Sequence, residues 1–188
     1  IYDARQNLAG TRRPQTTEIL RLLREKSTGH KRIALYMIGK FRLKDMISDV
    51  CECLNIPGME EDAIAVLKVF GVDASNELRR LFLKSAGNIN TCKIIIRLLG
   101  RYNTDINRQF IFERLWSGVR TIRENALNCL VNSDFEPSEQ EKIRLNKLII
   151  DQAETLIWLL SAKVTAAKQD NKPLCKTLDS EFLRWRSF

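Results

Sequence analysis

The sequence has little of what most catalytic and membrane-embedded proteins depend on. Its 188 residues include one histidine, eight glycines and four prolines, and no apolar run approaches the ~18 residues that a membrane span requires. It contains neither a glycine-rich phosphate loop nor two cysteine pairs at zinc-ligand spacing. Because glycine and proline are scarce and no flexible linker is present, we expect most of the chain to be ordered. These absences weigh against a membrane-spanning region, a phosphate-binding loop and a zinc centre.

The candidates for catalytic chemistry are few and poorly placed. His30 is the only imidazole and lies at the start of a predicted helix, where a capping or solvent-exposed role is the simpler interpretation. Cys51 and Cys53 lie on another predicted helix, where side chains two residues apart diverge by about 200° and do not converge on a metal. The five cysteines, an odd number, favour reduced thiols in the cytosol. We therefore expect no enzyme activity, no cofactor and no metal site.

A pattern that recurs roughly every thirty residues dominates what is present. In each copy the positions five, four and one before an anchor residue are apolar, and the anchor is glycine in the first three copies and valine in the fourth. The copies are Ala34–Gly39, Val66–Gly71, Ile95–Gly100 and Ala126–Val131. A fixed period of this length, with one apolar helical stripe in each unit, is typical of stacked helical hairpins.

The apolar spacing predicts pairs of helices, of which the second or inner helix carries the repeat. Outer helices are expected over 18–26, 44–54, 74–86 and 106–116, and inner helices over 30–40, 59–70, 91–102 and 119–131. Thr17 is predicted to cap the first helix, and Ser138 with Glu141 to form a capping box for a long helix that ends near residue 168. A last helix is expected over 174–185.

Three regions follow from this pattern: a basic lead-in over residues 1–16, the repeat array over 17–132 and a C-terminal helical cap over 133–188. The expected fold is all-α, an α-solenoid of about four helical hairpins closed by a long-helix cap. Paired helices in which Ala/Val-Leu…Leu-Gly ends the second helix resemble HEAT-like repeats. The likeness rests on Ala34-Leu35…Ile38-Gly39, Val66-Leu67…Phe70-Gly71, Ile95-Ile96…Leu99-Gly100 and Val119-Arg120, and covers about residues 18–131. It implies an architecture and leaves the function open, because such solenoids serve many roles.

The layout of the chain is similar to one more specific group. Four short repeats, a long amphipathic helix and a basic entry look like the soluble HEAT domain attached to some bacterial membrane proteins, whose major-facilitator-like region is related to ATP/ADP antiporters. The chain begins Ile-Tyr-Asp and ends in an apolar-basic segment, so both ends are interpreted as cut points in a longer protein, although a processed precursor would look similar. The resemblance implies a cytoplasmic domain at the inner face of the membrane, with the membrane part of its parent chain as a partner.

One face of the inner helices carries the candidate binding residues. Three positions in each copy are four residues apart and therefore lie along one side of a helix. They are the residues seven and three positions before the anchor and the residue directly after it. They are Arg32, Tyr36 and Lys40; Ile64, Lys68 and Val72; Lys93, Arg97 and Arg101; and Glu124, Asn128 and Asn132. The basic members predict a concave groove for an acidic peptide or a phosphate-bearing ligand, and Arg97 and Arg101 are suited to bidentate binding of either group. A solvated helix surface is the alternative, because Lys and Arg are good helix formers.

The net charge of +8 lies entirely within residues 1–44. Arg12, Arg13, Arg21 and Arg24 form a basic cluster there, and near a membrane each such residue contributes about 1 kcal/mol of attraction to anionic lipid. An anionic lipid surface at this end is therefore a possible partner, and a soluble basic terminus fits equally well.

Three functions remain open. We expect a non-catalytic interaction or regulatory domain, the cytoplasmic portion of a larger bacterial membrane protein. A free-standing protein- or peptide-binding scaffold is the alternative. A DNA-binding HEAT protein of the alkylation-repair glycosylase type is a second one. Those enzymes use a basic concave face with aromatic residues and an Asp, whereas here the stripe contains no Asp and Trp116 falls on an outer helix.

Overall fold

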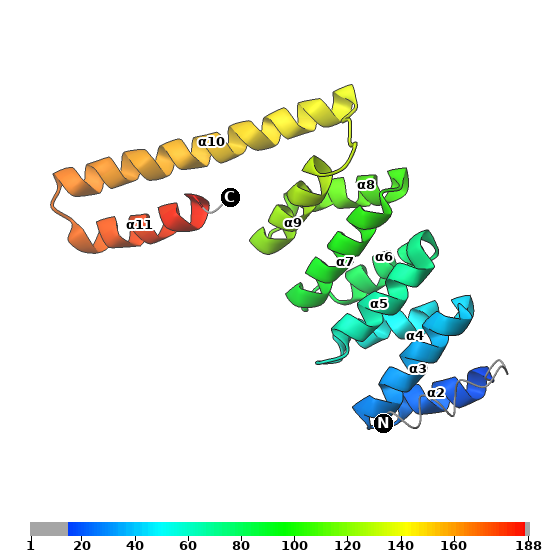
Figure 1. Ribbon diagram of the computed structural model, residues 1–188. Helices are drawn as coiled ribbons and strands as arrows, with labels where there is room; N and C mark the ends of the chain where they lie inside the picture. The colour runs from blue at the N-terminus through cyan, green and yellow to red at the C-terminus, as the bar shows by residue number, and fades with distance from the viewer. Residues whose placement is uncertain (1–14, 187–188) are drawn as a thin grey trace. The chain divides into compact units, whose positions relative to one another are not determined.

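The structure, a computed structural model, describes residues 15–186 and the side chains of residues 15–180. Every regular element in this part of the chain is a helix (Figure 1). With η for a 3-10 helix, the elements are α2 (Thr16–Arg24), α3 (Thr28–Phe41), η1 (Lys44–Met46), α4 (Ile47–Glu52), η2 (Cys53–Asn55), α5 (Glu60–Phe70), η3 (Gly71–Ala74), α6 (Ser75–Lys84), α7 (Ile89–Tyr102), α8 (Asp105–Phe112), η4 (Glu113–Trp116), α9 (Arg120–Val131), α10 (Glu139–Lys168) and α11 (Lys172–Arg186). The predicted all-α fold is confirmed. The chain divides into two compact units, Ile1–Asp134 (unit 1) and Phe135–Phe188 (unit 2).

Unit 1 is a succession of helix pairs. α2 packs on α3, α4 on α5, α6 on α7 and α8 on α9, while α3 also packs on α5 and α7 on α9 (Figure 1). The core lies between these layers, and its largest fully buried side chains include Ile19, Leu35, Ile38, Leu54, Leu67, Leu78, Ile95, Leu99 and Phe112. Burial of each of these side chains stabilises the fold by about 1.5–3 kcal/mol. The inner helices α3, α5, α7 and α9 carry the repeat found in the sequence.

Several predicted helix boundaries are wrong, and the outer helix predicted over 106–116, for example, is divided into α8 and η4. Thr17 does not cap the first helix, because α2 begins at Thr16 and is preceded by Gln15, which makes no side-chain capping bond. The Gln15 carbonyl already accepts the amide of Glu18 (3.0 Å), so the first turn starts earlier than expected. The outer helix predicted over 44–54 is divided into η1, α4 and η2. The backbone at Met46 (φ −103°, ψ 8°) lies outside the helical range, so the α-helical ladder starts only after it.

The repeat glycines have two different roles. Gly71 directly follows α5 with a φ of 57°, a conformation that glycine adopts without strain, and so ends the helix as expected. Gly39 and Gly100 lie inside α3 and α7, which continue past them. The left-handed positions after those two helices are occupied by Arg42 (φ 48°) and Asn103 (φ 45°). The inner helices predicted over 30–40 and 91–102 already extend past Gly39 and Gly100, and α7 ends at Tyr102 as predicted, so of the three anchor glycines only Gly71 directly follows its helix.

The fourth copy of the repeat differs from the first three. Leu35, Leu67 and Ile96 occupy equivalent positions and are at most 1% exposed, whereas Leu127 is 50% exposed and Val131 is 73% exposed. In unit 1 each of the first three inner helices is followed by a further helix pair, and α9 is the last. Leu127 therefore lies on the face of α9 that no further pair of unit 1 covers.

Polar side chains also join successive pairs of unit 1. The fully buried Asn107 on α8 donates from Nδ2 to Ser75 Oγ (3.0 Å), and its Oδ1 accepts from Arg79 (2.5 Å), both on α6. Thr91 on α7 donates from its hydroxyl to the Leu54 carbonyl (3.2 Å). A buried amide left without such partners costs roughly 1–3 kcal/mol, so these bonds favour one register between neighbouring helix pairs.

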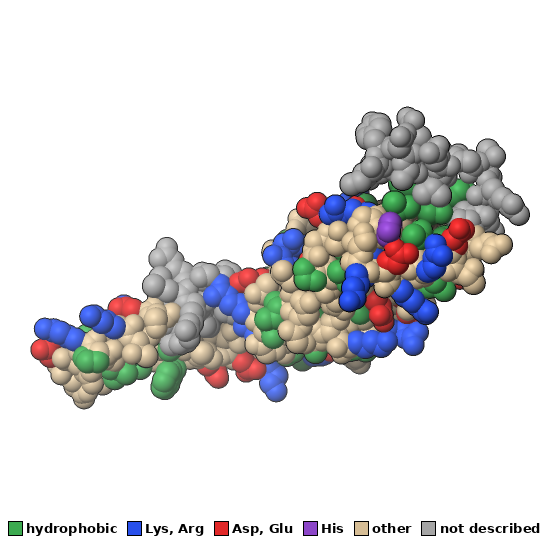
Figure 2. Space-filling view, turned by 90° about the horizontal axis from the view of Figure 1, so that it is seen from below, with side chains coloured by type: hydrophobic (Ala, Val, Ile, Leu, Met, Phe, Trp, Pro, Cys, Tyr) green, Lys and Arg blue, Asp and Glu red, His purple; other side chains and the backbone are tan. Residues whose placement is uncertain are grey.

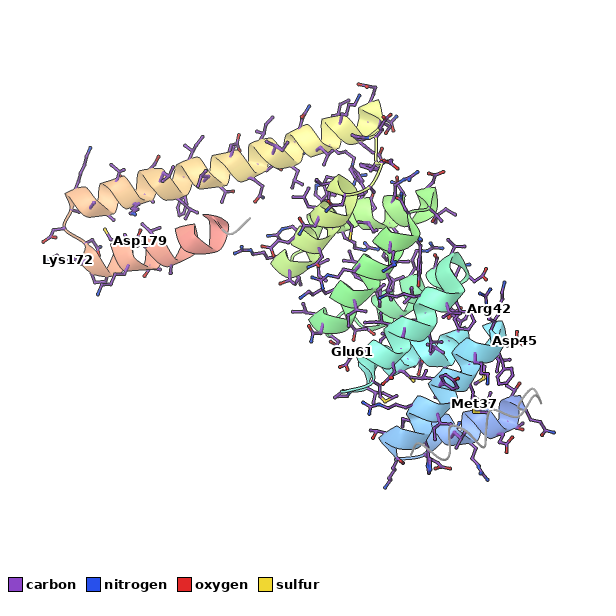
Figure 3. All side chains as sticks on the ribbon, in the orientation of Figure 1. Met37, Arg42, Asp45, Glu61, Lys172 and Asp179 are labelled. Carbon is purple, nitrogen blue, oxygen red and sulfur yellow. The ribbon has the colours of Figure 1, made fainter. Side chains whose placement is uncertain are left out.

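Unit 2 is a hairpin of α10 and α11. The predicted capping box is present, since the Ser138 amide donates to Glu141 Oε2 (2.8 Å) and the Glu141 amide to Ser138 Oγ (3.4 Å). The turn includes Asp170, which has a φ of 50°. Lys163 on α10 forms an ion pair with Asp179 on α11, and Figure 3 shows Asp179 on the hairpin, with Lys172 at the start of α11.

Candidate binding site

Two clefts open between inner helices of unit 1. The α3–α5 cleft has a volume of about 440 Å³ and is lined by Arg32, Leu35, Tyr36, Gly39, Lys40, Asp62, Ala65, Val66 and Val69. The α7–α9 cleft has a volume of about 300 Å³ and is lined by Arg97, Gly100, Arg101, Asn125, Asn128, Cys129 and Asn132. Both contain residues of the predicted stripe, and both contain the glycine of their repeat. The two clefts therefore occupy the same place in successive pairs of inner helices.

The two internal glycines let the inner helices approach closely. A Cβ added at Gly39 would lie 3.4 Å from Val66 Cγ2, a tight contact, whereas one at Gly100 would lie 2.8 Å from Cys129 Sγ and 2.9 Å from its Cβ. The second distance is well inside van der Waals contact, so only glycine fits between α7 and α9 at this point. Close packing beneath each cleft fixes the separation of the residues at its rim.

A hydrogen-bonded amide orients one arginine of the α7–α9 cleft. Asn125 is nine-tenths buried on α9. Its Oδ1 accepts from Arg97 Nε (2.9 Å), and its Nδ2 donates to the Thr121 carbonyl (2.7 Å). Both ends of this amide are thus satisfied, and the Arg97 guanidinium is held against α9 by its Nε. Arg101 follows one helical turn later and is exposed.

The α7–α9 cleft is positively charged. None of the described residues that line it is acidic. Burial raises the pKa of the Cys129 thiol above its ordinary value, although the charge of Arg97 acts in the opposite direction, so the thiol is neutral at physiological pH. Asn128 and Asn132 complete the α9 side, where Asn132 Nδ2 donates to the Asn128 carbonyl (2.7 Å). The cleft thus combines two guanidinium groups with three carboxamides.

The α3–α5 cleft has a different chemistry. Arg32 Nε lies 3.0 Å from Asp62 Oδ2, and Arg32 Nη2 donates to the Gly58 carbonyl (3.2 Å). Lys40 Nζ lies 5.9 Å from the centroid of the Tyr36 ring, within range of a cation–π contact. Tyr36 and Val69 are 54% and 45% exposed, so the walls of this cleft are mostly apolar. Its arginine is already paired with a carboxylate of the same chain.

The structure brings together only part of the predicted stripe. Arg97 and Arg101 share one cleft, and Arg32 and Lys40 share the other, whereas Lys68 and Lys93 line neither. Lys68 is exposed on α5 and Lys93 is half-buried on α7.

The N-terminal basic cluster can be described only in part. Arg21 and Arg24 are exposed on α2, whereas Arg12 and Arg13 lie outside the described residues. Figure 2, which views unit 1 from the side of α2, shows Lys and Arg interspersed with Asp and Glu on this face. Over the described residues, therefore, this face has mixed charge.

Asp62 and Asn125 distinguish the two clefts, because Asp62 pairs with the arginine of its cleft whereas Asn125 only orients one. Sequence reasoning missed both. Each comes from the facing helix, at a position outside the stripe derived from the repeat. Asp62 lies with Glu60 and Glu61 in the first turn of α5, where the helix dipole alone accounts for acidic residues. The sequence offers one signal for Asn125, which is a polar residue on the apolar inner side of a predicted helix. A buried amide needs hydrogen-bond partners, so such a residue indicates a specific contact.

Three cysteines outside the clefts, Cys51, Cys53 and Cys92, have the character of core residues. Burial raises the pKa of Cys51 to about 12, with a smaller contribution from Glu77, and burial also raises the pKa of Cys53 and Cys92. All three thiols are neutral and enclosed. Among residues 15–186 no group of three or more His, Cys, Asp or Glu side chains is arranged to hold a metal ion. No helix in the same part of the chain combines the length and apolar character of a membrane span.

The fold and the clefts together define an all-α protein made of packed helix pairs, with a basic cleft between two inner helices. Comparison of the sequence and structure with family models, with curated proteins and with solved structures gives no match.

Proposed function

We propose that residues 17–132 form a HEAT-like α-solenoid that binds an acidic segment of a protein partner without catalysis, through the α7–α9 cleft. One observation carries the proposal: Arg97 and Arg101 face a row of carboxamides, and the described residues that line this cleft include no carboxylate. A guanidinium matches a carboxylate in a bidentate geometry. A carboxamide both donates and accepts, and so matches the peptide groups on either side of an acidic residue.

The size of the cleft favours a peptide side chain as the group bound. A volume of about 300 Å³ is at the lower limit of small-molecule pockets, and accommodates one or two side chains of an extended chain. The α3–α5 cleft, with Tyr36 and Val69 exposed beside Lys40, offers an apolar contact one repeat pair away. The partner under this proposal is an acidic segment with apolar residues, in a separate protein or in the membrane part of the same parent chain. A cytoplasmic location at the inner face of a membrane remains part of the proposal.

Charge reversal in the cleft tests this function. The probes are a fluorescein-labelled Glu-rich peptide and its Gln-substituted counterpart, with fluorescence anisotropy of the full chain as the measurement. We expect the Glu peptide to bind and the Gln peptide to bind weakly. Arg97→Glu with Arg101→Glu should raise the Kd for the Glu peptide roughly ten-fold or more, because each charge-assisted hydrogen bond contributes about 1.5–3 kcal/mol.

The matched control reverses two charges outside both clefts. Lys26→Glu with Lys84→Glu changes the net charge by the same amount at exposed positions, and should leave the Kd within a few-fold of that of the unmodified chain. Equal losses of affinity in the two double variants would show that only net charge matters and would contradict a binding role for the cleft. Tighter binding of duplex DNA or anionic vesicles than of the Glu peptide, lost in Arg97→Glu with Arg101→Glu, would replace the acidic partner by a nucleic acid or a lipid surface.

A further inference from the structure

Helix α10 carries a second apolar stripe on a face that does not pack on α11. The side of α10 that is half-buried or buried includes Leu145, Leu148, Leu156, Leu159 and Ala166. The second stripe consists of four β-branched residues at intervals of seven, namely Ile143, Ile150, Ile157 and Val164, with exposures of 69%, 56%, 62% and 55%. Figure 2 shows hydrophobic side chains at the surface of unit 2.

The spacing of this stripe is that of a coiled-coil seam. Three positions after each β-branched residue come Asn146, Ala153, Leu160 and Ala167, so the two sets fill the a and d positions of four heptads. A helix that packs on an irregular surface needs only the average period of 3.6 residues. A strict interval of seven over four heptads instead favours continuous contact with one long helix, around which α10 would supercoil.

The length of the seam indicates which helix would pack on it. From residue 143 to residue 167 the seam extends about 36 Å at 1.5 Å per residue. Apart from α10, which has 30 residues, the longest described helix is α11, which has 15 and already packs on another face of α10. The last helix of unit 1, α9, has 12 residues. Within the described residues only another α10 matches the seam over its whole length.

We propose that α10 pairs with α10 of a second copy of this chain, through the seam of Ile143, Ile150, Ile157 and Val164 with Ala153, Leu160 and Ala167. Seven apolar side chains on each copy, each losing on the order of 80 Å², remove roughly 1,100 Å² in total. That area reaches the ~1,000 Å² that a specific interface requires. The dimer is independent of the cleft in unit 1, and either proposal can fail alone.

Charge and side-chain size favour an antiparallel pair. In a parallel pair Lys142 would flank the partner's Lys147, and Lys163 would flank the partner's Lys168, which places like charges on both edges of the seam. In an antiparallel pair Ile143 packs on the partner's Ala167, and Ala153 on the partner's Ile157. Two of the four kinds of layer in this register therefore set a large side chain against a small one.

The experiment measures the mass of the full chain by sedimentation over a range of micromolar concentrations. The unmodified chain is expected to form a dimer. Ile150→Glu with Ile157→Glu places four carboxylates in the dimer seam and should raise the dimer Kd about a hundred-fold or more. Trp158→Glu is the matched control, because Trp158 is 65% exposed on the same helix and lies off the seam, and it should leave the dimer intact. Far-ultraviolet circular dichroism should show unchanged helicity in both variants.

A second variant strengthens the dimer rather than breaking it. Asn146 is the one polar residue at an a or d position of the seam, and Asn146→Ile should lower the dimer Kd about ten-fold. The proposal is overturned by a chain that is monomeric at every concentration, or by a dimer that Trp158→Glu weakens as much as the seam variant. If the stripe instead packs on unit 1 of the same chain, the unmodified protein is monomeric and the seam variant lowers Tm independently of concentration. Monomers that associate only with lipid vesicles also overturn it.

Discussion

The two clefts of unit 1 differ in charge although they lie at equivalent places in the repeat. At the ninth position before the anchor residue, α5 has Asp62 and α9 has Ile122, which is 4% exposed. At the sixth position α5 has Ala65 and α9 has Asn125. In the α3–α5 cleft the carboxylate pairs with Arg32, whereas in the α7–α9 cleft the amide accepts from Arg97 and none of the described lining residues is acidic.

This difference shows that an inner-helix stripe alone does not make a basic groove. The helix that faces the stripe either neutralises the arginine or orients it. A fold built from repeats can therefore place a charged site at one inter-helix cleft and an apolar contact at another with no change of backbone architecture. Three sets of variants test this difference. They change the glycines beneath the two clefts, Tyr102 between the two pairs of inner helices, and the Arg32–Asp62 ion pair.

The largest effect is expected from the two internal glycines. Gly100→Ala should destabilise the chain by about 2 kcal/mol, because its new methyl group would overlap Cβ and Sγ of Cys129 and overpacking costs about 1–3 kcal/mol. Gly39→Ala meets only the methyl groups of Val66 at 3.4 Å or more, and the gain in helix propensity should offset that contact. Urea unfolding of both variants measures the difference, and equal stabilities would show that the α7–α9 contact is no tighter than the α3–α5 contact.

The next effect concerns Tyr102, which links the two pairs of inner helices. Its hydroxyl on α7 donates to the Leu67 carbonyl on α5 (2.7 Å). Tyr102→Phe should cost about 1 kcal/mol at neutral pH through loss of this bond, whereas Tyr36→Phe, at a ring that is 54% exposed, should cost less. The measurement is the free energy of unfolding, and equal losses in the two variants would contradict a structural role for the hydroxyl.

The same tyrosine gives stability a defined dependence on alkaline pH. Burial raises the pKa of Tyr102 to about 12 in the folded chain, above the value of about 10 in an unfolded one. Its contribution is fully present below pH ~10 and is lost as the pH rises through the folded pKa. The fall should be smaller in Tyr102→Phe, and a part should remain because the pKa of buried Cys51 is raised in the same direction.

The smallest effect is expected from the ion pair of the α3–α5 cleft. Asp62→Asn should cost less than about 1 kcal/mol of stability, because Arg32 and Asp62 are half exposed and such pairs contribute little. The same change releases Arg32 and should increase the affinity of the Glu-rich peptide by a few-fold. Glu61→Gln, at an exposed position beside it (Figure 3), makes the same change in net charge and serves as the control. Identical gains in the two variants would contradict a specific role for Asp62.

Local sequence signals predicted the helices well and their contacts less well. The periodicity of Ala34–Gly39 and its copies, together with the Ser138 capping box, depends on neighbours within a few residues, and the resulting helices are present. Arg97 and Arg101 could be grouped from the sequence because they are one helical turn apart. Asp62 and Asn125 were missed because their role depends on how one inner helix crosses the next. The close contact of Gly100 with Cys129 was not predicted for the same reason, since it leaves no mark in the local pattern.

The close contact between Cys129 and Gly100 has a consequence for the reactivity of the thiol. The thiol lines the cleft, and its sulfur lies 3.7 Å from the Ile96 carbonyl. The close contact with Gly100 leaves no room on the α7 side, so an adduct on this sulfur has to extend into the cleft. A carboxylate that bridges Arg97 to the amides of α9 would occupy that space and slow alkylation of this cysteine.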